Sequence, residues 1–188
     1  LTITERKLRA LLDAGLYGIQ MGVQTGSRRI QEIYQRPISN RKVLDAVHLL
    51  NRYRERMVPP SYDFIIDSPL ETAGDLIETL QLIRQFPRPY RLQLFSLVIF
   101  PETLLYHKAQ EENLLDASGE PRLEYHKRSA TYVNLVLGLY RHALPKWLLD
   151  ILSHPVMVRL LHRRSLNALY RLAYAGGRCL NRTVFRRR

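Results

Sequence analysis

The sequence predicts an α/β fold with parallel strands in the first two-thirds of the chain and an α-helical extension after it. Segments with helical periodicity alternate with short strand-like segments until about residue 124, and the strand-like segments then stop. The charge changes at the same place. Residues 1–130 carry 18 Lys and Arg against 16 Asp and Glu, whereas residues 131–188 carry 11 against one. We therefore expect two parts, residues 1–124 and residues 125–188.

Composition excludes several classes of protein. The 188 residues are 46% hydrophobic and 24% charged, which is typical of a globular protein and not of a disordered, collagen-like or disulfide-rich chain. The single cysteine, Cys179, excludes an internal disulfide and any structural metal site built from several thiolates. No apolar run is long enough to span a bilayer, and the sequence does not open on a signal segment in which an apolar run follows a charged one. We expect a piece of a longer, cytoplasmic protein.

The first predicted elements are a helix and a strand. Apolar residues recur three and four positions apart on one helical face, at Leu8, Leu11 and Leu12. Residues 2–5 have the pattern of a capping box for this helix. Residues 17–24 alternate with period two and predict a strand, with Tyr17 expected on its packed face.

The later elements continue the alternation. A turn at 25–27 leads into a short helix, and Ser39 is a candidate N-cap for a longer one. Strands are predicted at 62–67 and at about 92–99, each followed by a helix. Strand, helix and strand in this order indicate parallel strands joined by right-handed crossovers.

The extension predicts two helical stretches, roughly 129–143 and 146–175. Pro145 separates them, and Pro155 interrupts the second.

Polar residues fill one face of each of the first two strands. In the first strand this face contains Gly18, Gln20, Gly22 and Gln24, and in the second it contains Asp63, Ile65 and Asp67. Glycines and amides leave room and hydrogen-bonding groups, and the carboxyl ends of parallel strands are where α/β folds bind ligands. The alternative is that Gln24 and Asp67 only satisfy loop amides or cap the next helix.

Five motifs occur in a fixed order along the first part of the chain. They are GVQTGS at 22–27, Arg36, YDFIIDSPLET at 62–72, LFSL at 94–97 and FPET at 100–103. This ordered set resembles the second half of a radical S-adenosylmethionine (radical SAM) barrel and covers roughly residues 1–115. The DSPL segment at 67–70 departs from the commoner GLPG and is similar to members that carry a cobalamin-binding domain. The glycine usual in the last motif is replaced by Glu102.

The resemblance implies a partial (β/α) barrel and a binding site for S-adenosylmethionine. Gln24 would contact the ribose or amino acid part, Arg36 the carboxylate, and Asp63 the ribose hydroxyls, with the backbone around Ser96 and Leu97 against the adenine. No catalytic residue is assigned. Alternatively, Arg36 is a cation at a helix C-terminus and Asp63 a strand-end cap or ion-pair partner.

Radical SAM chemistry uses a 4Fe–4S cluster that is normally held by three cysteines, which this chain does not have. We therefore expect the C-terminal part of an enzyme of radical methyl transfer or related C–H functionalisation. The cluster loop, and a cobalamin domain if present, would lie in its N-terminal part. The alternative is a non-catalytic relative that keeps the barrel as a binding module. The six histidines show no metal-ligand spacing, so no metal site is predicted within the chain. Glu71 is expected in the first turn of its helix.

The basic extension interleaves arginines with aliphatic and aromatic residues. Such a segment can pack its apolar stripe against the first part, which is the interpretation we favour, or it can lie on an anionic membrane or bind nucleic acid. Nucleic acid is the less favoured partner because no single-strand stacking platform or RNA-binding module is recognisable. The predicted location is cytoplasmic, with peripheral membrane contact left open.

Overall fold

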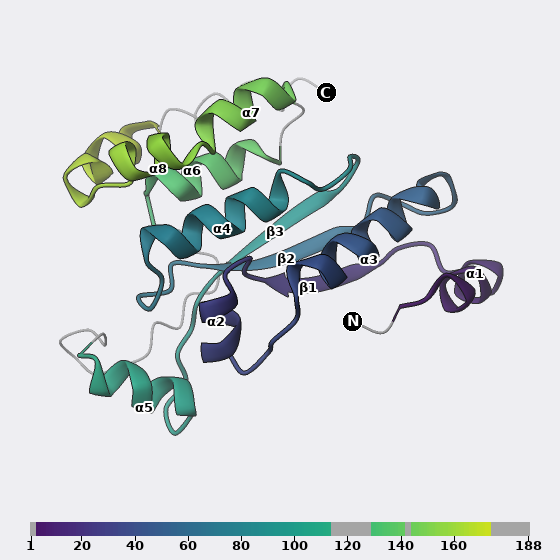
Figure 1. Cartoon of the computed structure of the whole chain (residues 1–188), viewed down its shortest axis with the longest axis horizontal. Coiled ribbons are helices and arrows are strands. Elements are labelled where there is room, and N and C mark those ends of the chain that lie inside the picture. The colour runs from purple at the N-terminus through teal and green to yellow at the C-terminus, as the bar shows by residue number, and fades with distance from the viewer. Residues whose placement is uncertain (1–2, 114–128, 142–143, 174–188) are drawn as a thin grey trace, which may run out of the picture. The chain divides into compact units, whose positions relative to one another are not determined.

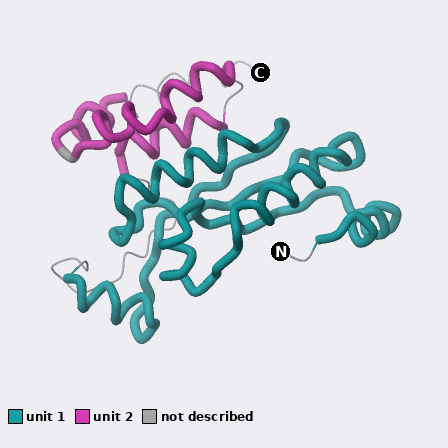
Figure 2. The backbone as a smooth tube through the Cα atoms, viewed as in Figure 1, with its two compact units in different colours: residues 1–127 teal, residues 128–188 magenta. Residues whose placement is uncertain are grey.

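The computed structural model describes residues 3–113, 129–141 and 144–173. The chain divides into two compact units, residues 1–127 and residues 128–188 (Figure 2). The boundary expected between residues 124 and 125 lies outside the described residues.

Unit 1 contains a parallel sheet of three strands, which confirms the α/β prediction. The strands β1 (Gln20–Gln24), β2 (Ser61–Ile66) and β3 (Arg91–Ser96) lie in the order β1-β2-β3. Helix α3 (Asn40–Arg52) leads from β1 to β2, and α4 (Ala73–Ile83) leads from β2 to β3 (Figure 1). Because the strands follow one another in sequence order, right-handed crossovers place both helices on the same face of the sheet.

The core of unit 1 lies between that face and the helices. Tyr62, Phe64 and Ile66 alternate along β2 and are at most 2% exposed. The helices contribute a similarly buried set, namely Val43, Val47 and Leu50 of α3 and Leu80 and Ile83 of α4. Tyr62 also packs edge-on against Phe86, with ring centroids 5.0 Å apart. These apolar contacts stabilise the sheet on the face that α3 and α4 cover, and not on the opposite face.

The other helices among the described residues of unit 1 are α1 (Glu5–Asp13), α2 (Arg28–Ile33), α5 (Leu104–Glu111) and the short 3-10 helix η1 (Arg54–Arg56). The predicted cap at Ser39 is confirmed, since its side chain accepts a hydrogen bond from the backbone N–H of Lys42. The expected capping box at residues 2–5 is wrong. Thr4 is the N-cap of α1, because its side chain accepts from the backbone N–H of Lys7.

Two predicted strands are shorter than expected. Strand β1 begins at Gln20 and not at residue 17, and Tyr17 is 73% exposed and not packed under a helix. The carbonyls of Tyr17 and Ile19 still accept hydrogen bonds, from Val58 and Ser61, but the segment is not extended strand. Strand β3 ends at Ser96. On α1, Leu11 is 48% exposed, so the packed stripe is narrower than predicted.

Unit 2 is helical. Its helices are α6 (Tyr132–Leu139), α7 (Lys146–Leu152), α8 (Pro155–Leu161), the 3-10 turn η2 (Arg164–Leu166) and a helical segment at 167–173. The second predicted stretch is therefore broken: α7 ends at Leu152 and α8 starts at Pro155, whose fixed φ suits a first helical position.

Tyrosine hydroxyls join the helices of unit 2. Tyr132 donates to the carbonyl of Leu152 (3.0 Å), and Tyr170 donates to the carbonyl of Leu161 (2.8 Å). These carbonyls end α7 and α8, where helical carbonyls lack intrahelical donors. Within the described ranges, no helix in either unit has the length and apolar character needed to cross a membrane.

Candidate functional site

The candidate site is the face of the sheet opposite α3 and α4. Alternate strand residues point to this open face, and Gly22 of β1, Asp63 of β2 and Gln93 of β3 lie side by side across it. Gly22 and Gln93 are exposed, whereas the neighbouring residues on the other face are covered. Parallel sheets normally bury both faces. A polar, uncovered face is therefore a candidate binding surface.

Asp63 has an unused acceptor on this face. The side-chain amide of Gln20 donates to Asp63 Oδ2 at 2.7 Å. Asp63 Oδ1 is buried and has no hydrogen-bond partner among the described residues, and the same is true of Ser61 Oγ, two residues earlier on β2. A buried polar atom left unpaired costs about 1–3 kcal/mol. A ligand hydroxyl would remove that cost if the Asp63 side chain turned to bring Oδ1, which is covered in this structure, to the open face.

Gln24 ends β1 in a strained backbone conformation. Its φ is +71°, and the N–H of Thr25 donates across it to the carbonyl of Val23 at 3.0 Å. This combination is the rarer, strained form of γ-turn. The register with β2 also shifts between Gly22 and Gln24. As a result, the Gln24 amide nitrogen lies 4.0 Å from the place where a Cβ on Gly22 would be, beside Asp63 on the open face.

The loops after the other two strands contain similar strain. Asp67 follows β2 with a φ of +59°, and Glu102 follows β3 with a φ of +61°. Asp67 Oδ2 accepts a hydrogen bond from the hydroxyl of Ser96, the last residue of β3, at 2.9 Å. Non-glycine residues with positive φ cost about 1–3 kcal/mol each and gather at functional sites. Gln24 is the last residue of β1 and Asp67 directly follows β2, whereas Glu102 lies further along the loop after β3.

The five expected contact residues are placed differently from one another. Gln24 and Asp63 both lie near Gly22, the first through its side-chain amide and the second as the strand neighbour of Gly22 on β2. The side chain of Ser96 is buried and engaged with Asp67, and the backbone N–H of Leu97 donates to the carbonyl of Ile66 at 2.8 Å. Arg36 is exposed after α2, and the structure gives its side chain no polar partner among the described residues.

Polar residues that the sequence analysis did not identify hold the loop between β1 and α2. Thr79 of α4 accepts from the N–H of Gly26 (2.9 Å), and Asn40 donates to the carbonyl of Gly26 (2.8 Å). Gln31 donates to the carbonyl of Thr25 (3.2 Å). A Cβ on Gly26 would lie 2.6 Å from Thr79 Cα, so only glycine permits this approach. We call these residues and Asp75 the loop clamp.

Asp75 is the buried centre of the loop clamp. Its carboxylate accepts hydrogen bonds from the hydroxyl of Ser27 (2.5 Å), from the guanidinium of Arg29 (2.5 Å) and from Thr72. Burial alone would raise the pKa of Asp75, but the bonds from Arg29, Ser27 and Thr72 outweigh it and hold the pKa well below its usual range. The spacing Thr72-x-x-Asp75 forms a capping box, which is the signal that could have identified Asp75 from the sequence.

Glu71 is not in the first turn of α4, contrary to expectation. It precedes the N-cap Thr72 and is half-buried. Burial, together with the negative charges of Asp75 and Asp67, raises the pKa of Glu71 to about 8. Glu71 is therefore largely protonated at neutral pH and adds a neutral carboxyl group close to the carboxyl end of β2.

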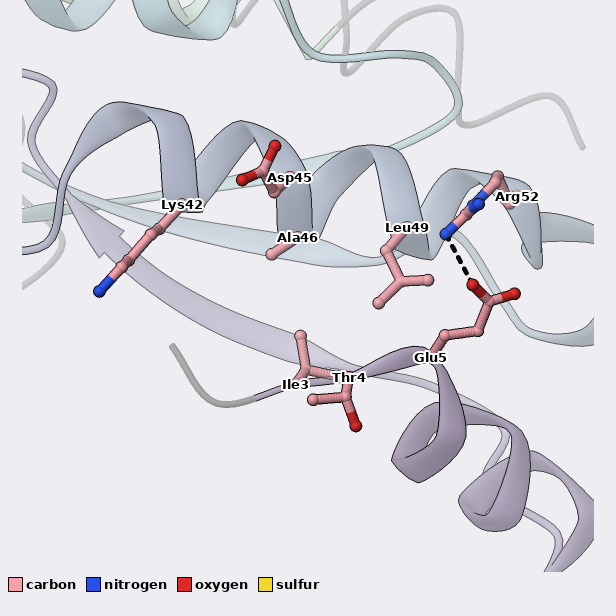
Figure 3. Close-up of a pocket in the computed structure, with 8 residues that line it drawn as sticks. All are labelled: Ile3, Thr4, Glu5, Lys42, Asp45, Ala46, Leu49 and Arg52. Atoms are coloured by element: carbon pink, nitrogen blue, oxygen red, sulfur yellow. Dashed lines mark hydrogen bonds and ion pairs between the residues drawn. The ribbon is translucent and has the colours of Figure 1, made fainter.

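A groove of about 370 Å³ lies between the start of α1 and α3 (Figure 3). Ile3, Ala46 and Leu49 face one another inside it, Lys42 also lines it, and Glu5 pairs with Arg52 at its rim (3.0 Å). It contains none of the expected contact residues and no buried polar atom without a partner among the described residues. The open face of the sheet remains the stronger candidate.

No protein-family model matches the chain, and a search of curated proteins gives no significant match. Among the described residues, no group of three or more His, Cys, Asp or Glu side chains could hold a metal ion. Cys179 lies outside the described residues.

Proposed function

We propose that this chain forms the S-adenosylmethionine-binding side of a radical SAM enzyme of methyl transfer or related C–H functionalisation. The observation that supports it most is the open face, where Gln24 and the unpaired Asp63 Oδ1 lie beside Gly22. The complete (β/α) barrel, of which the three-stranded parallel sheet would be one part, belongs to the same proposal.

The residues present fit S-adenosylmethionine in three respects. Asp63 Oδ1 offers a buried acceptor for a ribose hydroxyl, and Gly22 leaves space for the ligand to approach the backbone. The Gln24 amide can donate to and accept from the ribose or the amino acid part. The Leu97 N–H is already used by Ile66, so an adenine would contact other atoms at the end of β3.

A 4Fe–4S cluster does not fit this chain. Three thiolates are needed to leave one iron open, and the chain has one cysteine. Cluster ligands, and any cobalamin-binding residues, would have to come from another part of the protein. When bound to such a cluster and reduced, S-adenosylmethionine supplies a 5′-deoxyadenosyl radical. The residues of this chain would bind and orient it and exclude water from it.

Two measurements test the proposal. Titrating the isotopically labelled chain with S-adenosylmethionine should shift backbone resonances of Gly22, Gln24 and Asp63, and Asp63→Asn should weaken that binding about tenfold or more. Asp45→Asn, at an exposed position on α3, is the matched control and should leave it unchanged. Shifts elsewhere, or none, would contradict the assigned site.

The second measurement concerns the cluster. Reconstituted with iron and sulfide, the 188-residue chain should show no 4Fe–4S absorbance and no cleavage of S-adenosylmethionine. A protein that joins this chain to a CxxxCxxC segment should form 5′-deoxyadenosine under reduction. An intact protein without such a segment would indicate a non-catalytic binding module instead.

A further inference from the structure

Exposed apolar side chains are concentrated in unit 2. Six of the ten large apolar residues that are exposed among the described residues belong to it, although it supplies the smaller share of those residues. They are Trp147 (64% exposed), Ile151, Val156, Leu160, Leu169 and Leu172 (71% exposed). Single exposed apolar residues are ordinary, but a set this dense is typical of an interaction surface.

The six residues form one pair on each of three helices. Trp147 and Ile151 are four apart on α7, and Val156 and Leu160 are four apart on α8. Leu169 and Leu172 are three apart on the helical segment 167–173. Residues at these spacings share one side of a helix. The other sides are used inside unit 2, where Leu149, Val158 and Tyr170 are buried.

The charge of the same part of the chain is positive and almost uncompensated. Residues 131–188 contain 11 Lys and Arg, and Asp150 is the only acid. Asp150 already pairs with Lys146 at 3.1 Å. Three exposed arginines accompany the apolar pairs. Arg159 and Arg171 lie in sequence within the pairs of α8 and of 167–173, and Arg163 lies between these two pairs. Exposed tryptophan and aliphatic side chains suit the apolar acyl region of a lipid bilayer, and arginines suit its anionic headgroups.

We propose that the apolar pairs of α7, α8 and 167–173, together with Arg159, Arg163 and Arg171, dock unit 2 onto an anionic lipid bilayer. We call these nine residues the lipid surface. The apolar side chains enter the headgroup region, and the guanidinium groups bind lipid phosphates. A nucleic acid would also attract the arginines, but it gives no reason to expose aliphatic pairs on three helices. The inference does not depend on the radical chemistry proposed above.

The chain provides its own probe, since Trp147 is its only tryptophan. Titrating the full chain with vesicles of phosphatidylcholine containing phosphatidylglycerol should shift Trp147 emission to the blue, and brominated acyl chains should quench it. Vesicles of phosphatidylcholine alone should bind at least about tenfold more weakly, since each basic side chain near an anionic surface strengthens binding about fivefold. Salt should weaken the binding.

Matched variants separate the contribution of the apolar side chains to vesicle binding from that of the arginines. Ile151→Ser and Leu172→Ser should each weaken vesicle binding several-fold, whereas Leu104→Ser, at an equally exposed apolar position in unit 1, should not. Arg163→Glu should weaken it more than tenfold, while Arg6→Glu, with the same change of charge on α1, should have little effect. Far-ultraviolet circular dichroism of every variant checks that the helices remain.

Several outcomes would overturn the proposal. They are an unchanged Trp147 spectrum with every vesicle, equal binding to neutral and anionic vesicles, tighter binding to RNA than to vesicles, and concentration-dependent self-association that buries Trp147 without lipid. Vesicle binding in which control and surface variants weaken alike would also reject the lipid surface.

Discussion

Replacing Asp75 with asparagine tests whether the loop clamp holds the candidate site in place. The substitution keeps the shape of the side chain but removes its charge. Asp75 is 4% exposed and accepts bonds from Ser27, Arg29 and Thr72. An asparagine retains one acceptor oxygen and points its amide donors at groups that themselves donate.

The size of the effect follows from these contacts. Hydrogen bonds to a charged group contribute about 1.5–3 kcal/mol each, and removing one partner of a buried pair costs about 3–5 kcal/mol. The side chain of Arg29 is 49% exposed, so water can solvate its guanidinium when Asp75 loses its charge. The upper end of the range for a buried pair therefore does not apply. We expect Asp75→Asn to lower the free energy of unfolding by about 2–4 kcal/mol.

Urea unfolding followed by circular dichroism measures the global loss, and amide hydrogen exchange locates it. The amide of Gly26 should lose protection, because the start of α4 no longer fixes Thr79 against it. Asp45→Asn is the matched control and should change the stability by less than about 0.5 kcal/mol. Unchanged protection at Gly26 together with a loss below about 1 kcal/mol would refute the reasoning.

Three further changes have distinct signatures. Gln24→Gly should raise the free energy of unfolding by up to about 1 kcal/mol, because glycine tolerates the positive φ at this position. The control Gln20→Gly, within β1, should lower the free energy of unfolding. Equal effects of the two substitutions in urea unfolding would count against strain at Gln24. Gly26→Ala should cost about 2 kcal/mol or more, since its Cβ would lie 2.6 Å from the backbone of α4, whereas Gly138→Ala, with open space in α6, should stabilise by about 0.5–1 kcal/mol. Because the pKa of Glu71 is raised from 4.5 to about 8, its contribution to stability is present below pH 4.5 and is lost as the pH rises through about 8. Glu71→Gln should therefore remove about 2–4 kcal/mol of pH dependence between these values, and an unchanged pH profile of the unfolding free energy would contradict the burial of its carboxyl.

The sequence could predict those features that depend on neighbouring residues. Period two located β2, and a serine before a helical stripe located the cap at Ser39, because both patterns are local. The exposure of Tyr17 and the burial of Glu71 depend on which elements pack nearby. A single sequence does not show these tertiary neighbours. The conformation of Gln24 is also non-local, since Thr79 holds its loop from 53 residues beyond Gly26.

The loop clamp and the strain at Gln24 should be energetically coupled. A residue with positive φ persists only where its surroundings over-determine it, at a cost of about 1–3 kcal/mol. Here the surroundings are the hydrogen bonds that Thr79 and Asp75 accept from the loop directly after Gln24, and the one that Asn40 donates to it. If Asp75→Asn loosens this loop, Gln24 can relax, and little strain remains for glycine to relieve.

In a double-mutant cycle, Gln24→Gly should therefore stabilise the Asp75→Asn protein less than it stabilises the original chain, with a coupling of about 0.5–1 kcal/mol. Strict additivity would mean that the positive φ is a property of the γ-turn alone. The loop clamp would then have no part in presenting the Gln24 amide beside Asp63, and S-adenosylmethionine binding should survive its removal. Coupling would instead make the clamp a positioning device for the open face.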